Sequence, residues 1–372
     1  MHTRAAVLRS SPGELATATV QLDEPRQNEV TVRLVASGLC HSDDHRATGD
    51  FAGTGRIWCG GHEGAGVIEI VGPNTPGFEA GDHVVFSFLP ACGRCRPCAR
   101  GQQQLCDLGR FIGRGGRFED PPSYRMRLDG EPVEQMSGLG AFSERTTVSV
   151  HSVCKVPREL PLRSLCLLAC GVSTGWGAAV NAAGVRPGDT VIVMGMGGIG
   201  TAAVQGAAHA GADHIIVADP STFKRDRSTT FGATDAVATI DEAAELARSY
   251  TNGQGADSTI VSVGVLTASH VAEAIKSIGK GGTVALVSVG QNGSLPLPFG
   301  ATRFNMLQQT IKGVIFGNWS PFQSIPMLTA MYAQGRLQLD EMITRSYHLD
   351  EVAQGFRDMR AGKNIRGIVE FG

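Results

Sequence analysis

An apolar run, Thr190–Met194, leads directly into a glycine turn, Gly195-Met-Gly197-Gly198-Ile-Gly200, and then into the alanine-rich stretch Thr201–Ala210. A buried strand, a glycine turn and a helix in this order are typical of a βαβ unit, in which helices cover a parallel sheet. Further apolar runs alternate with helical stretches, at His214–Ala218, Ser258–Val263 and Thr283–Val289. The sequence therefore predicts an α/β domain with a parallel sheet.

The spacing of the glycines in this turn indicates a dinucleotide site. Gly195 permits a tight turn, Gly197 lets backbone N–H groups approach a pyrophosphate, and Gly200 allows the helix to pack closely. Gly198 is the remaining glycine of the motif. Asp219 ends the next apolar run, 19 residues after Gly200. A carboxylate there accepts hydrogen bonds from the adenosine ribose and repels a 2′-phosphate, so NAD is favoured over NADP. The alternative is that the glycines only mark turns and Asp219 is an ordinary turn residue.

The first 150 residues follow a different pattern, with little helical periodicity. Short β-type runs separated by turn residues predict a compact β-rich domain; these runs are Arg4–Arg9, Val30–Ala36, Gly66–Val71 and Asp82–Phe88. From about Phe316 two helical segments precede a last β-type run; they are Ile325–Gln334, Leu349–Ala361 and Gly367–Phe371. By its pattern alone this tail fits either domain. We also predict a long surface loop over Gly109–Glu134, which is rich in Arg, Gly and Pro.

Composition excludes several classes of partner. The 33 basic and 35 acidic side chains give a net charge of −2, and no basic run marks a nucleic-acid site. The longest uncharged stretch, between Asp189 and Asp213, holds six glycines and is too weakly apolar to span a membrane. The N-terminal residues lack the apolar core of a signal peptide, so we expect a cytoplasmic protein. Its nine cysteines then point to metal binding or catalysis before disulfides.

Four of these cysteines form a compact motif, with Cys92, Cys95 and Cys98 at two-residue gaps and Cys106 after seven further residues. Such gaps let successive thiolates turn onto one tetrahedral centre at about 2.3 Å. Four sulfurs leave no position for a substrate, which predicts a structural zinc. An iron–sulfur cluster, or cysteines that merely lie in a turn-rich loop, are the alternatives.

Other cysteines and histidines are dispersed along the chain. A catalytic zinc needs three Cys or His ligands and one open position, and Cys40, His62 and Cys170 would form such a set. Spacing alone does not separate them from other candidates, or from buried thiols and surface histidines. These other candidates are Cys59, Cys154, Cys166, His41 and His45.

Six segments, in this order, resemble the zinc-dependent medium-chain alcohol dehydrogenases, of the long form that includes the liver-type and glutathione-dependent formaldehyde dehydrogenases. They are G-L-C-H-S-D-D-H at 38–45, G-G-H-E-G-A-G-V-I at 60–68, C-G-R-C-R-P-C at 92–98 with Cys106, A-C-G-V-S-T-G-W-G at 169–177, G-M-G-G-I-G at 195–200 and G-K-N-I-R-G-I-V at 362–369. The likeness implies a GroES-like, β-rich catalytic domain at 1–171 that contains the structural zinc lobe. It also implies a Rossmann NAD-binding domain with a doubly wound parallel sheet at 172–315, and a segment at 316–372 that completes the catalytic domain.

The resemblance implies which residues surround the catalytic zinc. Cys40, His62 and Cys170 fall on the family's ligand positions, with water or a substrate oxygen as the fourth ligand. One catalytic and one structural zinc per subunit follow. The residues placed around this ion are Ser42, which takes the proton of the alcohol, His45, where the relay reaches solvent, Asp43, which orients His62, and Glu63, which lies behind the zinc. A buried salt bridge is the alternative for Glu63.

The cofactor contacts are implied in the same way. His41 and Arg366 match positions that contact the pyrophosphate, Thr174 lies against the nicotinamide, and Lys224 lies near the adenosine ribose. For His41 and Lys224 a solvated surface role is the alternative.

The implied function is transfer of a hydride between a primary or secondary alcohol and NAD, with an aldehyde or ketone as product. Phe88 and Trp176 fall near the positions of an apolar substrate channel. The partners are then a small alcohol or aldehyde and further copies of the chain, as a homodimer or higher homo-oligomer.

Three other functions stay open. A thiol-dependent formaldehyde dehydrogenase is suggested by Arg110, four residues after Cys106, where glutathione-using members carry an anion-binding arginine. A nicotinoprotein, which retains NAD(H) and passes electrons to an external acceptor, is suggested by G-V-I-F-G at 313–317 and by Ile325-Pro326. A non-catalytic dinucleotide sensor is expected to lack a catalytic ligand, whereas all three are present.

Overall fold

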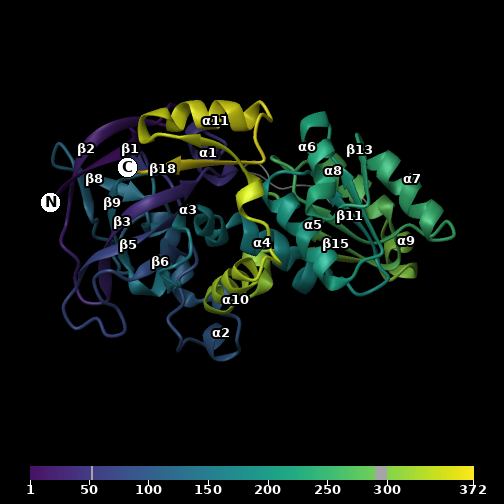
Figure 1. Ribbon diagram of the computed structural model, residues 1–372, viewed down its shortest axis with the longest axis horizontal. Helices are drawn as coiled ribbons and strands as arrows, with labels where there is room; N and C mark the ends of the chain where they lie inside the picture. Colours follow the sequence, from purple (N-terminus) through teal and green to yellow (C-terminus); the bar gives the residue numbers. More distant parts are fainter. Residues whose placement is uncertain (52, 290–299) are drawn as a thin grey trace. The chain divides into compact units, whose positions relative to one another are not determined.

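The computed structural model describes residues 1–51, 53–289 and 300–372. These residues form two compact units, one of Met1–Cys170 with Trp319–Gly372 and one of Gly171–Asn318 (Figure 1). The first unit is therefore built from both ends of the chain, and the second from one continuous segment. The predicted ranges 1–171, 172–315 and 316–372 remain a prediction of how the chain divides into functional domains.

The main sheet of the first unit has seven strands, and it positions the residues of interest. In order they are β10 (Val153–Lys155), β6 (His83–Phe86), β5 (Glu63–Val71), β3 (Glu29–Gly38), β18 (Arg366–Glu370) and β17 (Ile343–Tyr347), with β9 (Arg145–Ser149) paired to β3. β3 runs antiparallel to both β5 and β18, so Gly38 lies opposite Glu63 on one side and Ile368 on the other. The C-terminal strands are thus an integral part of a sheet that begins near residue 29.

A second set of strands closes into a small barrel. Its strands are β1 (His2–Leu8), β2 (Ala16–Leu22), β7 (Met126–Leu128), β8 (Glu131–Gln135) and β4 (Ile57–Cys59). The helices of this unit are α1 (His41–Thr48), α2 (Arg96–Ala99), α3 (Leu162–Leu165), α10 (Pro321–Ala333) and α11 (Val352–Arg360). The apolar side chains of β1, β2, β7 and β8 fill the barrel, which is typical of strands whose inward positions are alternately apolar.

The prediction of a long surface loop over Gly109–Glu134 is wrong. The segment contains β7 and most of β8, joined by a two-residue turn in which Asp129 and Gly130 have φ of 54° and 83°. Two positive φ angles are typical of the tight hairpin turn that Asp-Gly favours. Its arginines are not all exposed either, because Arg117 and Arg125 are buried and both contact Glu29, at 3.0 and 2.8 Å. A carboxylate from a distant strand therefore makes their burial possible.

The second unit holds a six-stranded parallel sheet. Its order is β13 (Asp235–Val237), β12 (His214–Ala218), β11 (Thr190–Met194), β14 (Ala256–Val261), β15 (Ile278–Leu286) and β16 (Thr310–Gly313). The helices, several of which flank the sheet in Figure 1, are α4 (Gly171–Gly177), α5 (Gly198–Ala210), α6 (Thr222–Ser228), α7 (Ile240–Tyr250), α8 (Ala268–Ser277) and α9 (Ala301–Met306). Taken in chain order the strands are arranged 3-2-1-4-5-6, which is the order of the dinucleotide-binding Rossmann fold. The predicted α/β fold with a doubly wound parallel sheet is confirmed.

Local sequence explains the core of this unit. All five residues of β11 are buried, as expected for a central strand covered on both faces. α7 begins with a capping box, in which Thr239 Oγ1 accepts a hydrogen bond from Glu242 N–H and Glu242 accepts one from Thr239 N–H. Among the described residues no single helix is long and apolar enough to cross a membrane; one broken pair, Leu162–Ala169 with Gly171–Ala183, passes that test by length and composition only.

Candidate active site

Cys40, His62 and Cys170 meet in the first unit. Together with Glu63 they place one ligand atom each within 4.8 Å of one another, and all four residues are buried. Cys40 follows β3 and His62 precedes β5, so the antiparallel pairing of these strands brings the two residues to one end of the sheet. Cys170 follows a 3₁₀ helix, Cys166–Ala169, that packs against both strands. The spacing in the sequence could not select this trio because strand pairing assembles it.

Asp43 holds His62 in one orientation. Its Oδ2 lies 2.9 Å from His62 Nδ1, and its Oδ1 accepts a hydrogen bond of 2.7 Å from the N–H of Gly61. Gly61 has φ of 88°, and a Cβ there would lie 2.4 Å from the backbone N of Phe142. Only glycine fits this close approach. With Nδ1 directed at a carboxylate, the Nε2 atom of His62 is left for a metal ion.

The electrostatics of the trio suit a cation. Burial opposes a charged His62, but the charges of Asp43 and Cys40 outweigh it and raise the pKa of His62 to about 10. The hydrogen bond from Cys170 and the charge of His62 lower the pKa of Cys40 well below its ordinary value, although burial opposes this. The trio therefore favours the thiolate form of Cys40, which is the form that binds a metal ion. A divalent cation would take the place of the imidazole proton.

Glu63 is paired with Arg366 rather than left facing the sulfurs alone. Arg366 donates a hydrogen bond from its guanidinium to Glu63 Oε2, and both side chains are buried. A Cβ on Gly38 would lie 2.1 Å from Glu63 Oε2 and 2.6 Å from an Arg366 nitrogen, so the pair occupies the space that a side chain at 38 would need. The structure thus contains the buried salt bridge that was the alternative for Glu63, next to the metal-ligating atoms.

The predicted relay residues lie on α1. Ser42 Oγ is 3.7 Å from Cys40 Sγ. His45 is buried, and its Nδ1 lies 3.0 Å from Asp50 Oδ2. His41, in the first turn of the same helix, is partly exposed, with its ring 6.3 Å from that of His45. Within the described chain no hydrogen bond joins Ser42 to His45, so a bridging hydroxyl group or water is needed between them.

The glycines of the dinucleotide motif each have a distinct geometry. Gly195 has φ of 97°, a Cβ on Gly200 would lie 1.8 Å from the carbonyl oxygen of Gly195, and a Cβ on Gly197 would meet nothing within 4 Å. Gly198 is the first residue of α5. The turn is therefore tight, the helix is packed closely, and open space remains above Gly197, where an anion can approach the N-terminus of α5.

Asp219 follows β12 and faces this turn. Its Oδ2 accepts a hydrogen bond of 2.7 Å from Met196 N–H, and its Oδ1 accepts one of 2.9 Å from Ser221 N–H. Lys224 Nζ lies 3.9 Å from Asp219 Oδ2. Thr174 lies on α4 and is buried. Each oxygen of Asp219 keeps capacity for a ribose hydroxyl, because a carboxylate oxygen can accept two hydrogen bonds.

Cys92, Cys95, Cys98 and Cys106 form a second cluster, with all four sulfurs within 4.8 Å of one another. Two sulfurs about 2.3 Å from one tetrahedral ion lie about 3.8 Å apart, and Cys95 Sγ and Cys106 Sγ are 3.8 Å apart. Backbone N–H groups support the sulfurs, and they help lower the pKa of Cys92 to about 6 against the effect of burial. The donor set and its dimensions fit a zinc ion without rearrangement.

Comparison with known proteins identifies the family. Residues 26–158 match the family described as alcohol dehydrogenase GroES-like domain, and residues 198–331 match the one described as zinc-binding dehydrogenase. The chain is 46% identical, over 99% of both sequences, to the NDMA-dependent alcohol dehydrogenase of Amycolatopsis methanolica. It belongs to the zinc-dependent medium-chain alcohol dehydrogenase family. The resemblance inferred from the sequence is confirmed, and so is the GroES-like fold of the β-rich unit.

Solved structures of this family superimpose on the whole chain. The alcohol dehydrogenase zinc-binding domain protein of Burkholderia ambifaria gives a TM-score of 0.91 at 31% identity and covers 100% of this chain and 99% of its own. The benzyl alcohol dehydrogenase of Acinetobacter calcoaceticus gives 0.91 at 27% identity, with 100% of both chains covered. As in other zinc-dependent alcohol dehydrogenases, zinc and NAD are the cofactors.

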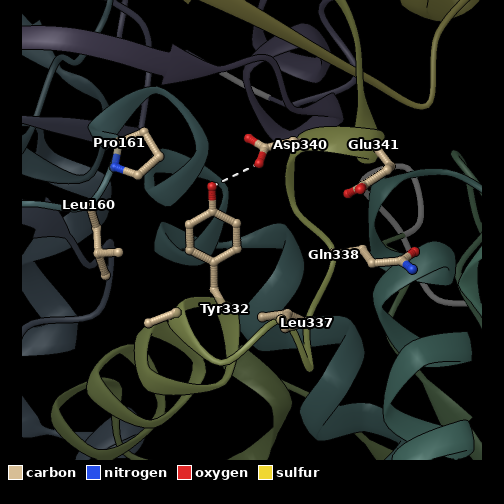
Figure 2. Close-up of a pocket in the computed structure, with 9 residues that line it drawn as sticks. Leu160, Pro161, Tyr332, Leu337, Gln338, Asp340 and Glu341 are labelled. Atoms are coloured by element: carbon tan, nitrogen blue, oxygen red, sulfur yellow. Dashed lines mark hydrogen bonds between the residues drawn. The ribbon is translucent and has the colours of Figure 1, made fainter.

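A cavity of about 480 Å³ opens elsewhere on the first unit of this alcohol dehydrogenase (Figure 2). Tyr332, near the end of α10, points toward Asp340 and donates a hydrogen bond of 2.8 Å to its Oδ2. No residue that lines the cavity is a predicted site residue or a member of the metal-ligating cluster.

Two residues of the site were not predicted from the sequence. Asp50 contacts His45, and Gly61 fixes the loop that carries His62. Gly61 is one of two adjacent glycines before His62, a signal for unusual backbone geometry. Asp50 follows Gly49, which ends α1 in a left-handed conformation, so a return of the chain toward the last helical turn could have been predicted.

Proposed function

We propose that the protein oxidises a small primary or secondary alcohol to an aldehyde or ketone. Zinc held by Cys40, His62 and Cys170 would stabilise negative charge on the alcohol oxygen, and NAD would accept the hydride. The observation that carries the proposal is the buried meeting of two thiols and one imidazole, with the nearby Glu63 paired to Arg366. Such a set leaves one tetrahedral position open.

We assign the proton to a path along α1. Ser42, two residues after Cys40, takes the proton of the alcohol, and His45 receives it from Ser42 through a bridging hydroxyl group or water. The contact of Ser42 Oγ with Cys40 Sγ, at 3.7 Å, supports this assignment because it keeps the hydroxyl near the reacting oxygen. Asp43 keeps His62 in its orientation.

We assign the cofactor to the glycine turn. Gly195, Gly197, Gly198 and Gly200 would hold the pyrophosphate at the start of α5, and Asp219 would bind the ribose. The contacts of Asp219 with Met196 N–H and Ser221 N–H support NAD over NADP, since they fix a charged carboxylate where a 2′-phosphate would have to lie.

The remaining cofactor contacts are assigned by the match to the family's motifs. They are His41 and Arg366 at the pyrophosphate, Thr174 at the nicotinamide and Lys224 at the adenosine ribose. Phe88, whose ring lies 5.6 Å from that of His62 in an edge-on arrangement, would provide an apolar wall for the substrate, as would Trp176.

The second cluster, of Cys92, Cys95, Cys98 and Cys106, is assigned to the structural zinc, because four sulfurs complete the tetrahedral shell. Nine free cysteines, six of them in metal clusters, suit a reducing compartment, so we place the protein in the cytoplasm.

A second candidate is a nicotinoprotein that keeps its NAD(H) and uses an external electron acceptor. The identity of 46% to a relative named NDMA-dependent alcohol dehydrogenase favours it. Gentle purification followed by absorbance and mass analysis of released nucleotide tests this candidate. Protein without bound nucleotide that turns over rapidly with added NAD would exclude it.

We also propose a homodimer formed through β16. This strand is at one edge of the parallel sheet, and Met306 and Ile315 beside it are 79% and 39% exposed. Among the described strands β16 has a neighbour on one side only, and an open edge with apolar residues nearby favours pairing with a second copy. Native mass spectrometry gives the number of subunits, and a monomer at working concentration would contradict the proposal.

Cys40→Ser tests the main proposal. The variant should lose one of two zinc ions per subunit and nearly all alcohol oxidation, while the cluster of Cys92 keeps its ion. Cys154→Ser is the matched control, because Cys154 is equally buried but belongs to no cluster. It should keep both ions and full activity. An unchanged zinc content with retained turnover in Cys40→Ser would overturn the assignment.

A further inference from the structure

The two ring nitrogens of His45 have different surroundings. The side chain is only 4% exposed, and Nδ1 lies 3.0 Å from Asp50 Oδ2. Nε2 is buried and makes no hydrogen bond within the part of the chain that the structure describes. A buried polar atom without a partner is costly, so Nε2 is the ring nitrogen that is available to a group binding beside His45.

Local sequence places Asp50 against this ring. Gly49 ends α1 with φ of 87°, which turns the chain back along the helix. Phe51 N–H then donates a hydrogen bond of 3.1 Å to the carbonyl oxygen of His45, and the two rings lie 5.0 Å apart. Thr48 Oγ1 donates a hydrogen bond of 2.7 Å to Asp50 Oδ2, the same oxygen that faces His45. The carboxylate is therefore held from two sides.

We propose that Asp50 is a positioning residue for His45 in alcohol oxidation. Its carboxylate keeps the proton of the neutral ring on Nδ1, so that Nε2 presents a lone pair to the proton leaving Ser42. When Nε2 gains that proton, the ring becomes an imidazolium that Asp50 stabilises. The proton on Nδ1 can then leave for water by way of Asp50, whose side chain is 25% exposed, and the ring returns to the Nδ1-protonated tautomer when the Nε2 proton exchanges with solvent. The inference rests on the proposed function, in which His45 accepts the proton.

Other charged groups lie near His45. Asp44 pairs with Arg360 from α11, although its charge also acts on His45, and Arg46 pairs with Glu134 from β8 at 3.4 Å. The ring of His41 lies 6.3 Å from that of His45. Among these groups Asp50 is the carboxylate in contact with the imidazole, so removing its charge has a local and specific effect.

Asp50→Asn removes the charge but keeps an oxygen that can accept a hydrogen bond from Nδ1. Single-turnover hydride transfer, followed across pH, should lose about tenfold in rate, because a stabilisation of one pH unit corresponds to a factor of ten. The pH dependence of this rate should also differ from that of the wild type, because the protonated ring loses the carboxylate beside it. Asp50→Glu should restore part of the lost rate and bring the pH dependence closer to that of the wild type. Thr48→Val, which leaves the charge in place but removes one of the two groups that hold the carboxylate, should change the rate and its pH dependence less than Asp50→Asn does.

Nitrogen NMR of histidine-labelled protein gives a second readout that needs no turnover. His45→Gln assigns the signal among the ten histidines. The neutral ring should carry its proton on Nδ1 in the wild type and a mixture of tautomers in Asp50→Asn. A wild type that oxidises alcohols, with pH profile and tautomer unchanged in Asp50→Asn, would overturn the inference and leave the proposed function intact. A wild type without any alcohol turnover would instead remove the proposed function.

Discussion

Glu63 and Arg366 form an ion pair although 303 residues separate them in the chain. Their side chains are 0% and 6% exposed, and Glu63 belongs to the same cluster of ligand atoms as Cys40, His62 and Cys170. The pairing of β18 with β3 brings Arg366 to this place. The last strand of the chain therefore supplies the counter-charge for a carboxylate at the metal cluster.

Replacement of Arg366 by Met should destabilise the protein by about 3–5 kcal/mol, because it leaves the carboxylate of Glu63 buried without a partner. Urea unfolding at constant zinc concentration measures this free energy. Arg163→Met is the matched control: Arg163 pairs with Glu370 at 2.8 Å, but both side chains are about 40% exposed, and its loss should cost less than about 1 kcal/mol. Equal effects of the two substitutions would refute the prediction.

The fold was predictable where apolar runs are continuous and bounded by turn residues. The ranges predicted for β11 and β12 agree with the structure at both ends, because buried parallel strands leave no polar position inside the run. The hairpin of β7 and β8 was missed because its arginines suggested exposure. Arg125 is 1% exposed because Glu29, almost a hundred residues earlier, neutralises it, and no local pattern reveals such a contact.

The residues of the candidate site were harder to predict from the sequence than the strands were. The four cysteines from Cys92 to Cys106 lie close together in the sequence, so their spacing alone predicts a metal cluster. Cys40, His62 and Cys170 come together only through strand pairing, and the resemblance to a family was needed to select them. Asp50 lies outside the family's motifs quoted above, and only coordinates place it beside His45.

Glu29 should make stability depend on acid pH. Burial alone would raise the pKa of Glu29, but the charges of Arg125 and Arg117 and the N–H of Arg26 outweigh it and hold the pKa below the ordinary value of 4.5. A carboxyl whose pKa is lowered in the folded state stabilises fully above 4.5, and that contribution is lost as pH falls through the folded value. The urea midpoint of the wild type should therefore fall in this range.

Glu29→Gln isolates this effect. At neutral pH it should cost about 3–5 kcal/mol, since two buried guanidinium groups lose their counter-charge. The difference from the wild type should shrink as pH drops below 4.5, because the wild type then loses the same charge. Glu14→Gln, which affects a carboxylate that is 70% exposed, should show no such convergence. A difference that stays constant down to acid pH would contradict the assignment.

Cys95→Ser should remove the other zinc ion. One zinc per subunit should remain, at the catalytic cluster, and the segment around Cys92 should lose its order because the ion links parts of the chain that share little core. Trypsin should then cut readily after the exposed Arg94 and Arg100. Metal analysis and mapping of the cleavage sites measure both effects. Retention of two zinc ions, or cleavage equal to that of the wild type, would count against a structural zinc here.

Asp219→Asn should change the preference between the two dinucleotides. The substitution keeps the shape of the side chain but removes the charge that repels a 2′-phosphate and accepts strong hydrogen bonds from a ribose. A hydrogen bond to a charged group contributes about 1.5–3 kcal/mol, so the ratio of kcat/KM for NAD to that for NADP should fall about tenfold or more. The ratio is informative because a general loss of activity affects both kcat/KM values equally.

Asp235→Asn is the matched control. It changes a carboxylate on the neighbouring strand β13 that contacts Tyr250 and Thr234 instead of the glycine turn, and it should leave the ratio unchanged. If Asp219→Asn lowers both values in proportion, the carboxylate supports only the turn through Met196 and Ser221, and the preference for NAD has another origin.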